Sequence, residues 1–263
     1  MRAVRRAVLV GLLLGSVPAA TTEAAEALTY DHVHLGVPDP KVATEWYVKY
    51  LGATRRPDGM PGVFFGPTRF NMRVTAKPTP SDGAVVDHVA LSYTDVAATV
   101  AGLAGSGARV LEPVHQIPGL YRAAMIEDPW GVKLELVEDP QLLGFHHAHT
   151  RAADPAAMLR WFEDVFGGRR GMLKGRVEGL QFGPVWLLVD RADNPPPSDG
   201  HAIDHLGFRT TDITSELAYL KGRNVPVLGE PRPDPNVATT FATFVEIRSV
   251  HGCSWSNSAG EDS

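Results

Sequence analysis

The sequence predicts an α+β fold built from four repeated modules, in each of which a strand, a helix and further short strands follow one another. Three observations predict it. Residues 30–37 alternate polar and apolar side chains with the period of two that is typical of a strand. An aspartate and an amphipathic segment that ends at a glycine come next. The same order then returns at a steady offset, which indicates internal duplication.

The opening strands mark where each module begins. They start near residues 30, 86, 145 and 203. His147 follows His32 by 115 residues, and the pair Asp204-His205 follows Asp87-His88 by 117 residues. We therefore expect two domains of two modules each, over 28–140 and 145–257.

A helix is predicted after each opening strand, because an aspartate precedes each amphipathic segment and can accept hydrogen bonds from its first backbone N–H groups. Proline follows this aspartate in modules 1 and 3, where it suits the first helical position. Glycine ends the same two helices. The aspartates are Asp39, Asp95, Asp154 and Asp212, and the glycines are Gly52 and Gly167. The predicted closing strands include 63–65, 70–74, 125–127 and 132–137.

Composition limits the classes of function. The chain has 263 residues, of which 44% are hydrophobic, so it can form one large core or two smaller ones. Its net charge is −5, and basic residues cluster only at the extreme N-terminus, so we expect no nucleic-acid partner. Cys253 is the single cysteine, which excludes an intramolecular disulfide.

The N-terminal residues 1–27 are predicted to be a signal peptide. Three arginines within residues 2–6 precede an apolar run over 7–14, and small-residue cleavage signals follow at 17–19 and 25–27. The apolar run is shorter than the roughly 20 residues that span a bilayer, although an uncleaved anchor is the alternative. We expect an exported protein, periplasmic or extracellular, without membrane association after cleavage.

The histidines of the opening strands are the candidate functional residues. His32 and His34 share one face of the first strand, opposite the apolar Val33 and Leu35. Two such histidines are often plain polar residues of a half-buried sheet. However, His32 has counterparts in every module, at His88, His147 and His205, whereas His34 recurs only as His149.

The Asp-His openings and the run 128–136, Asp-Pro-Trp-Gly-Val-Lys-Leu-Glu-Leu, resemble the vicinal oxygen chelate superfamily. This group includes glyoxalase I, extradiol dioxygenases and bleomycin-resistance proteins. The resemblance covers nearly all of the chain after residue 27. It implies βαβββ modules that pair into two curled mixed-sheet cups with flanking helices, modules 1 and 2 forming the first domain. It also implies metal ligands on first and last strands, facing into the cup.

Carried over to this chain, the resemblance implies that His32, His88 and Glu135 hold one divalent metal ion, which is Fe, Mn, Zn or Ni. Two imidazoles and one carboxylate occupy three positions of such an ion and leave others open. A small substrate with two adjacent oxygens can then chelate the metal. His34 is expected to line the pocket, to act as base or to replace His32, and Tyr121 to hydrogen-bond the substrate. Weaker pocket candidates are Arg69, Asn71, Arg73 and Arg122.

The second half departs from this pattern. It retains His147 and His205, but Ser256 stands at the position that corresponds to Glu135. We therefore expect the second half to be non-catalytic and to shape the cup, serve a homodimer or hold a weaker metal. The alternative is a site formed by His147, His205 and His251.

The expected function is that of a divalent-metal-dependent enzyme acting on a small molecule through vicinal oxygens. Glyoxalase-type isomerase or lyase chemistry and dioxygenase chemistry both suit this metal set. The alternative is a metal-independent protein that binds or sequesters a small ligand, of the bleomycin-resistance type. Such proteins lack the ligand triad, which the first half of this chain retains.

Overall fold

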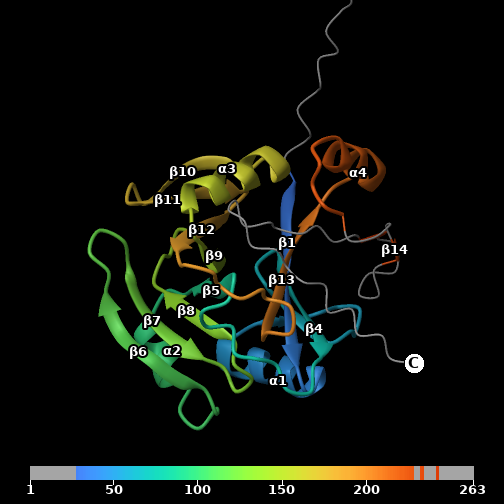
Figure 1. The fold of residues 1–263 in the computed structure, drawn as a ribbon. Helices are drawn as coiled ribbons and strands as arrows, with labels where there is room; N and C mark the ends of the chain where they lie inside the picture. The colour runs from blue at the N-terminus through green and yellow to red at the C-terminus, as the bar shows by residue number, and fades with distance from the viewer. Residues whose placement is uncertain (1–27, 228–231, 234–240, 243–263) are drawn as a thin grey trace, which may run out of the picture.

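The computed structural model describes residues 28–227, 232–233 and 241–242. Within these residues, four helices accompany two mixed sheets of five and eight strands, neither of which closes into a barrel (Figure 1). The predicted α+β class with two curled mixed sheets is confirmed. None of the helices in these ranges is both long enough and apolar enough to cross a membrane.

The first three modules each contain an opening strand, a helix and three further strands. Module 1 comprises β1 (Thr29–Val37), α1 (Pro40–Leu51), β2 (Thr54–Arg55), β3 (Gly62–Phe65) and β4 (Thr68–Val74). Module 2 comprises β5 (Val86–Ser92), α2 (Val96–Ala101), β6 (Arg109–Gln116), β7 (Arg122–Glu127) and β8 (Lys133–Val137). Module 3 comprises β9 (Gly144–Ala152), α3 (Pro155–Phe166), β10 (Arg169–Leu173), β11 (Val177–Phe182) and β12 (Val185–Arg191). Module 4 begins with β13 (Ile203–Arg209) and α4 (Ile213–Gly222), and β14 (Arg232–Pro233) and β15 (Phe241–Ala242) follow.

The helix ends follow the predicted chemistry. The Asp39 carboxylate accepts hydrogen bonds from the backbone N–H groups of Lys41 and Val42, which are otherwise without partners in the first turn. At the other end, Gly52 adopts the left-handed conformation with φ of 65°, which a residue with a side chain rarely takes. Asp95, Asp154 and Asp212 accept equivalent bonds at the other three helices.

The modules pair across the two halves of the sequence, which corrects the expectation that modules 1 and 2 form one cup. Strand β1 pairs antiparallel with β13 of module 4, and β5 pairs antiparallel with β9 of module 3. The five-stranded sheet therefore has the order β13-β1-β4-β3-β2, and the eight-stranded sheet β10-β11-β12-β9-β5-β8-β7-β6. Both pairings form within one chain.

Two features explain this pairing. Only residues 138–143 connect β8 to β9, so module 3 follows module 2 at once and meets the free edge of β5. The two longer linkers then bond to each other: the backbone N–H of Val85 donates to Pro196, that of Val86 to the Ser198 hydroxyl, and that of Thr79 to Gly200. These contacts hold module 4 against module 1.

Among the described residues, the larger of two apolar clusters lies between the sheets and the helices. The face of β1 opposite its histidines is fully buried at Val33, Leu35 and Val37, each of which contributes about 1.5–3 kcal/mol through burial. Tyr47 of α1 is also fully buried, and its hydroxyl donates to the Asp128 carboxylate at 2.8 Å. The polar faces of the opening strands are thereby fixed toward the interiors of the two cups.

Candidate metal centre

Three buried donors meet on adjacent strands of the eight-stranded sheet: His88 on β5, Glu135 on β8 and His147 on β9. Ala90 is the direct cross-strand partner of both Glu135 and His147, so their side chains share the face to which His88 also points. The His147 Nε2 atom lies 3.0 Å from the Glu135 Oε2 atom, and His88 Nε2 lies 3.8 Å from it. None of the three residues is more than 8% exposed.

The protonation of His147 and Glu135 suits a divalent cation. Burial lowers the pKa of His147 to about 3, so its imidazole is neutral. Burial alone would raise the pKa of Glu135, but the close contacts of His147 and His88 outweigh it and hold this carboxyl well below its usual range. The His147 Nε2 atom is buried and has no hydrogen-bond partner. A buried ring nitrogen that lies 3.0 Å from an anionic oxygen without a hydrogen bond between them is an arrangement that a bound cation would satisfy.

A second carboxylate orients His88. Its Nδ1 atom lies 2.6 Å from the Asp87 carboxylate, so that Nε2 faces the centre. Asp87 is itself held by Lys133 at 2.9 Å and Arg151 at 3.0 Å. Burial would raise the pKa of Asp87, but its hydrogen bonds, that to His88 foremost, hold it below the usual range.

The strand register explains why each Asp-His pair has this shape. On β1, β5 and β13, the aspartate that directly precedes His32, His88 or His205 is the extra residue of a β-bulge opposite the partner strand. A bulge rotates its residue out of the regular alternation, so the aspartate can reach the Nδ1 atom of the neighbouring histidine. The bulged aspartates are Asp31, Asp87 and Asp204, which contact His32, His88 and His205.

Module 3 uses a different residue in the bulge. His146 replaces the aspartate, and its Nδ1 atom lies 2.8 Å from His147 Nδ1. Its Nε2 atom lies 3.4 Å from the Asp139 carboxylate, which Lys174 contacts at 2.8 Å. The side chains of His146 and Asp139 are both fully buried. A carboxylate thus supports His147 as well, through one additional imidazole.

A fourth histidine borders the centre. The His149 ring lies 4.6 Å from that of His88, and donor atoms of His88, His147 and His149 all lie within 4.8 Å of one another. Its Nε2 atom is 3.1 Å from the Asp190 carboxylate. Leu188 is the cross-strand partner of His149, just as Glu135 is the partner of Ala90. Module 3 therefore supplies no carboxylate at the position that corresponds to Glu135.

Comparison with known proteins places the chain in a family. Residues 29–136 and 144–255 each match the Glyoxalase/Bleomycin resistance protein/Dioxygenase superfamily. The chain belongs to this superfamily.

Solved structures with the same fold include a glyoxalase I and a putative dioxygenase. Glyoxalase I from Zea mays is 16% identical, with a TM-score of 0.57 over 80% of this chain and 85% of that chain. A mutant of glyoxalase I from Zea mays gives a TM-score of 0.59 at 18% identity, over 81% and 87% of the two chains. A putative dioxygenase from Bacillus subtilis gives 0.56 at 18% identity, over 80% and 79%. No curated protein matches the chain.

In this chain, a group of mainly apolar side chains lies beside the three donors and is called the apolar wall below. Tyr121 lies on it, and its ring packs edge-on against His146 at a centroid distance of 5.4 Å. Burial raises the pKa of the Tyr121 hydroxyl, and the Glu135 and Asp139 carboxylates add to the effect. The hydroxyl therefore remains a hydrogen-bond donor at neutral pH. The buried residues of this wall are Ala90, Tyr121, Ala123, Val137, Leu173, Trp186 and Leu188.

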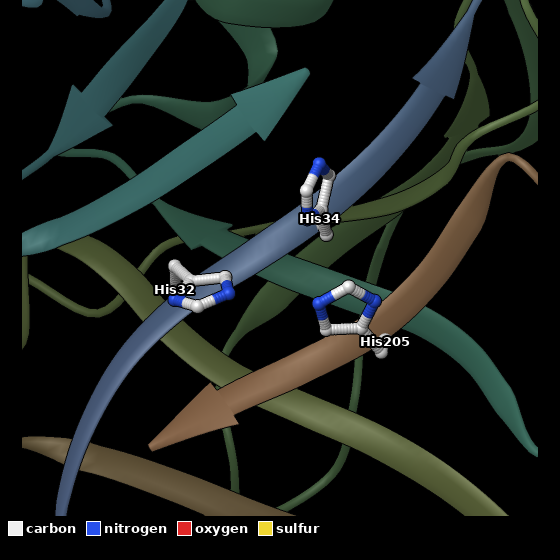
Figure 2. A group of neighbouring side chains, drawn as sticks. All are labelled: His32, His34 and His205. Atoms are coloured by element: carbon white, nitrogen blue, oxygen red, sulfur yellow. The ribbon is translucent and has the colours of Figure 1, made fainter. Parts of the chain in front are cut away.

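The predicted ligands do not form one group, because His32 lies in the other sheet. His32 and His34 of β1 meet His205 of β13 there (Figure 2). The prediction that His32 joins His88 and Glu135 is thus corrected, since β1 pairs with module 4 and β5 with module 3. His147, predicted only as a weaker candidate, takes the place beside them. For the same reason His34 and Tyr121 lie in different cups.

The weaker candidates on β4 and β7 make structural contacts. Arg69 pairs with Asp31, and Arg73 with Asp204. Asn71 accepts a hydrogen bond from Arg56 at 2.8 Å, and Arg122 pairs with Glu138 near the surface. The positions His251, Cys253 and Ser256 and the predicted signal peptide lie outside the described residues.

Proposed function

We propose that the chain is a metal-dependent dioxygenase that acts on a small molecule with two adjacent oxygens, such as a catechol. The observation that carries this proposal is the three-donor set His88, Glu135 and His147. Leu188, which cannot bind a metal, stands on β12 at the position that corresponds to Glu135 on β8. Two histidines and one carboxylate with open positions are typical of non-haem iron oxygenases. A divalent ion bound by these donors would act as Lewis acid for both substrate oxygens and bring O₂ beside them.

The protein groups around the donors have roles that suit such a substrate. The apolar wall, which includes Trp186 and Leu188, offers side chains of the kind that contact an aromatic ring. His149, whose Nε2 atom lies 3.1 Å from the Asp190 carboxylate, is placed to accept the proton of a substrate hydroxyl. The Tyr121 hydroxyl, which stays protonated, donates a hydrogen bond to a developing oxyanion.

The reaction is balanced without a further reagent. For a catechol, one O₂ is consumed, one carbon–carbon bond of the ring breaks next to the diol, and both oxygen atoms enter the product. Glyoxalase-type isomerisation of a 2-oxoaldehyde adduct, in contrast, moves a proton within the substrate and consumes no O₂. The two candidate chemistries therefore differ in a quantity that can be measured directly.

The test uses the full chain, loaded separately with Fe²⁺, Mn²⁺, Ni²⁺ and Zn²⁺. Metal content is measured first, and then O₂ uptake on a catechol panel and turnover of a 2-oxoaldehyde panel. We expect about one ion in the centre, O₂ uptake matched to product, and loss of both in Glu135→Gln. Glu112→Gln is the matched control, because Glu112 is exposed on β6.

Two outcomes would contradict the proposal. Turnover of 2-oxoaldehydes without O₂ uptake would assign the centre to isomerase chemistry. A chain that retains none of the four metals, yet is stabilised by a hydrophobic ligand in a thermal-shift screen, would be the small-ligand-binding protein of the alternative hypothesis.

We also propose that residues 1–27 direct export. The support is their charged, apolar and small-residue order. Expression of the full chain in a bacterial host should give mature protein outside the cytoplasm, beginning near residue 20 or 28. Full-length protein retained in the cytoplasm would contradict this.

A further inference from the structure

Two adjacent imidazoles connect the candidate metal centre to a carboxylate outside the three-donor set. His147, a proposed ligand, contacts His146 through their two Nδ1 atoms at 2.8 Å. The Nε2 atom of His146 is hydrogen-bonded to the Asp139 carboxylate at 3.4 Å. The Nε2 atom of His147 lies 3.0 Å from the Glu135 carboxylate. A row of four ring nitrogens therefore has a carboxylate at each end.

The Asp139 end of this row is held in place. The Asp139 side chain is fully buried, and Lys174 contacts its carboxylate at 2.8 Å. The Ser92 hydroxyl donates to the Asp139 backbone carbonyl at 2.8 Å and accepts from its N–H at 3.1 Å. Tyr121 packs edge-on against the His146 ring. Hydrogen bonds and packing therefore fix both the carboxylate and the imidazole that contacts it.

Each ring of the row carries one hydrogen. The His147 imidazole is neutral. Lys174 already balances the charge of Asp139, so a positive charge on the fully buried His146 would have no counterpart. A neutral imidazole has one N–H donor and one nitrogen acceptor. Because one Nδ1 atom must donate and the other accept, the tautomer of one ring dictates that of the other.

The row therefore has two arrangements. In the first, His146 donates from Nε2 to Asp139 and His147 donates from Nδ1 to His146, which leaves a lone pair on His147 Nε2. In the second, both hydrogens lie on the opposite nitrogens, and His147 donates to Glu135. An ionised carboxylate only accepts, so each arrangement satisfies one end of the row. The contacts are those of the first: His146 Nε2 bonds to Asp139, whereas the buried His147 Nε2 atom has no hydrogen-bond partner.

We propose that His146 is a positioning residue of the metal centre, through which Asp139 keeps the hydrogen of His147 on Nδ1. The Nε2 lone pair of His147 is thereby available to a metal ion, because a histidine ligand binds through the nitrogen that carries no hydrogen. Asp87 does the same for His88 by direct contact with its Nδ1 atom at 2.6 Å. This role requires the metal centre of the proposed function but does not depend on its reaction.

The two ligand histidines differ in what accepts their Nδ1 hydrogen. His88 donates to a carboxylate, whereas His147 donates to a neutral ring, and the second carboxylate lies one imidazole further from the metal. A hydrogen bond to a carboxylate makes a histidine ligand more basic. His147 is therefore the weaker electron donor of the two. An ion in this centre would keep more of its Lewis acidity than one held by two Asp-His pairs.

The test reads the tautomer of His147 by NMR spectroscopy of the isotope-labelled, metal-free full chain. We expect the hydrogen of His147 on Nδ1 and that of His146 on Nε2. His88 is the internal reference, since its Nδ1 atom contacts Asp87. In Asp139→Leu, the acceptor at the far end is lost, and the hydrogen of His147 should move to Nε2, where Glu135 accepts it.

Metal affinity gives an independent measurement. In a Mn²⁺ titration against a competing chelator, His146→Leu should lower the affinity by about 10–100-fold, the typical loss for an outer-shell partner. His146→Asn should restore most of it, because the side-chain oxygen replaces Nδ1 as acceptor. A role in packing alone predicts the opposite order, since leucine fills more of the buried space than asparagine. His115→Asn is the matched control, because His115 is exposed on β6.

A hydrogen on Nε2 of His147 in the metal-free wild type would overturn the proposed role, as would one that stays on Nδ1 in Asp139→Leu. Equal losses of Mn²⁺ affinity in His146→Asn and His146→Leu would also overturn it. Thermal unfolding of each metal-free variant establishes that it is folded. Failure of the dioxygenase proposal gives a different result, since the tautomer and the Mn²⁺ affinities would then be as expected while O₂ uptake is absent.

Discussion

Replacement of Asp87 by asparagine tests whether the Asp-His pair orients a metal ligand. The Asp87 carboxylate contacts the His88 Nδ1 atom at 2.6 Å and accepts from the Gly83 backbone N–H at 2.7 Å. Asparagine preserves the shape but removes the charge. Loss of such an outer-shell partner typically lowers metal affinity by about 10–100-fold, which corresponds to about 1.4–2.7 kcal/mol.

The same substitution also weakens the metal-free fold. Lys133 and Arg151 both contact Asp87, and removal of one partner of a buried pair costs about 3–5 kcal/mol. Lys133 retains the Asp82 carboxylate at 2.6 Å, and the Arg151 side chain is 29% exposed. We therefore expect a loss below this range, about 2–3 kcal/mol.

Two assays check these numbers. Mn²⁺ titration against a competing chelator gives the affinity of the centre, and urea unfolding of the metal-free chain gives the free energy of unfolding. Asp204→Asn is the matched control, since Asp204 supports His205 in the other cup and should leave Mn²⁺ affinity unchanged. Wild-type Mn²⁺ affinity in Asp87→Asn would refute the orienting role, whatever happens to stability.

Three further predictions concern the stability of the metal-free chain. Burial lowers the pKa of His34 to about 3, so below pH 6.5 the folded state binds fewer protons than the unfolded state, and the free energy of unfolding should fall as pH falls. His34→Gln should reduce the slope of the free energy of unfolding against pH, between about pH 6 and 4, by about 1.4 kcal/mol per pH unit. The control variant His115→Gln should not reduce it. Tyr47→Phe leaves the buried Asp128 carboxyl without the Tyr47 hydroxyl, and urea unfolding should show a loss of about 1–3 kcal/mol; an unchanged midpoint would contradict it. Asp39→Ala removes the cap of α1 and should cost about 1 kcal/mol by the same measurement, while Asp39→Asn should restore most of it.

The repeated modules were predictable because their signals are local. Period-two strands, aspartate caps and glycine stops each depend on a few neighbouring residues, and they identify α1 and α3 with their ends. Strand β6 carries no such signal. Almost all of its residues are exposed at the edge of the eight-stranded sheet, so no apolar alternation marks it.

The composition of the centre was only partly predictable. The offset of 115 residues identifies His32 and His147 as equivalent, but equivalence does not say which strand edges meet. That depends on linker lengths and on hydrogen bonds between distant segments, such as the bond from Val86 to Ser198. The sequence therefore identifies His88 and Glu135 as neighbours within one module, while the third donor follows only from the pairing of β5 with β9.

The carboxylates around and within the three-donor set determine the charge of the candidate metal centre. Each outer carboxylate is balanced by a cation: Asp87 by Lys133 and Arg151, and Asp139 by Lys174. The inner donors alone then determine the charge, and Glu135 is the single anion among them. A divalent ion in this cup would retain about one positive charge, which suits a singly deprotonated diol.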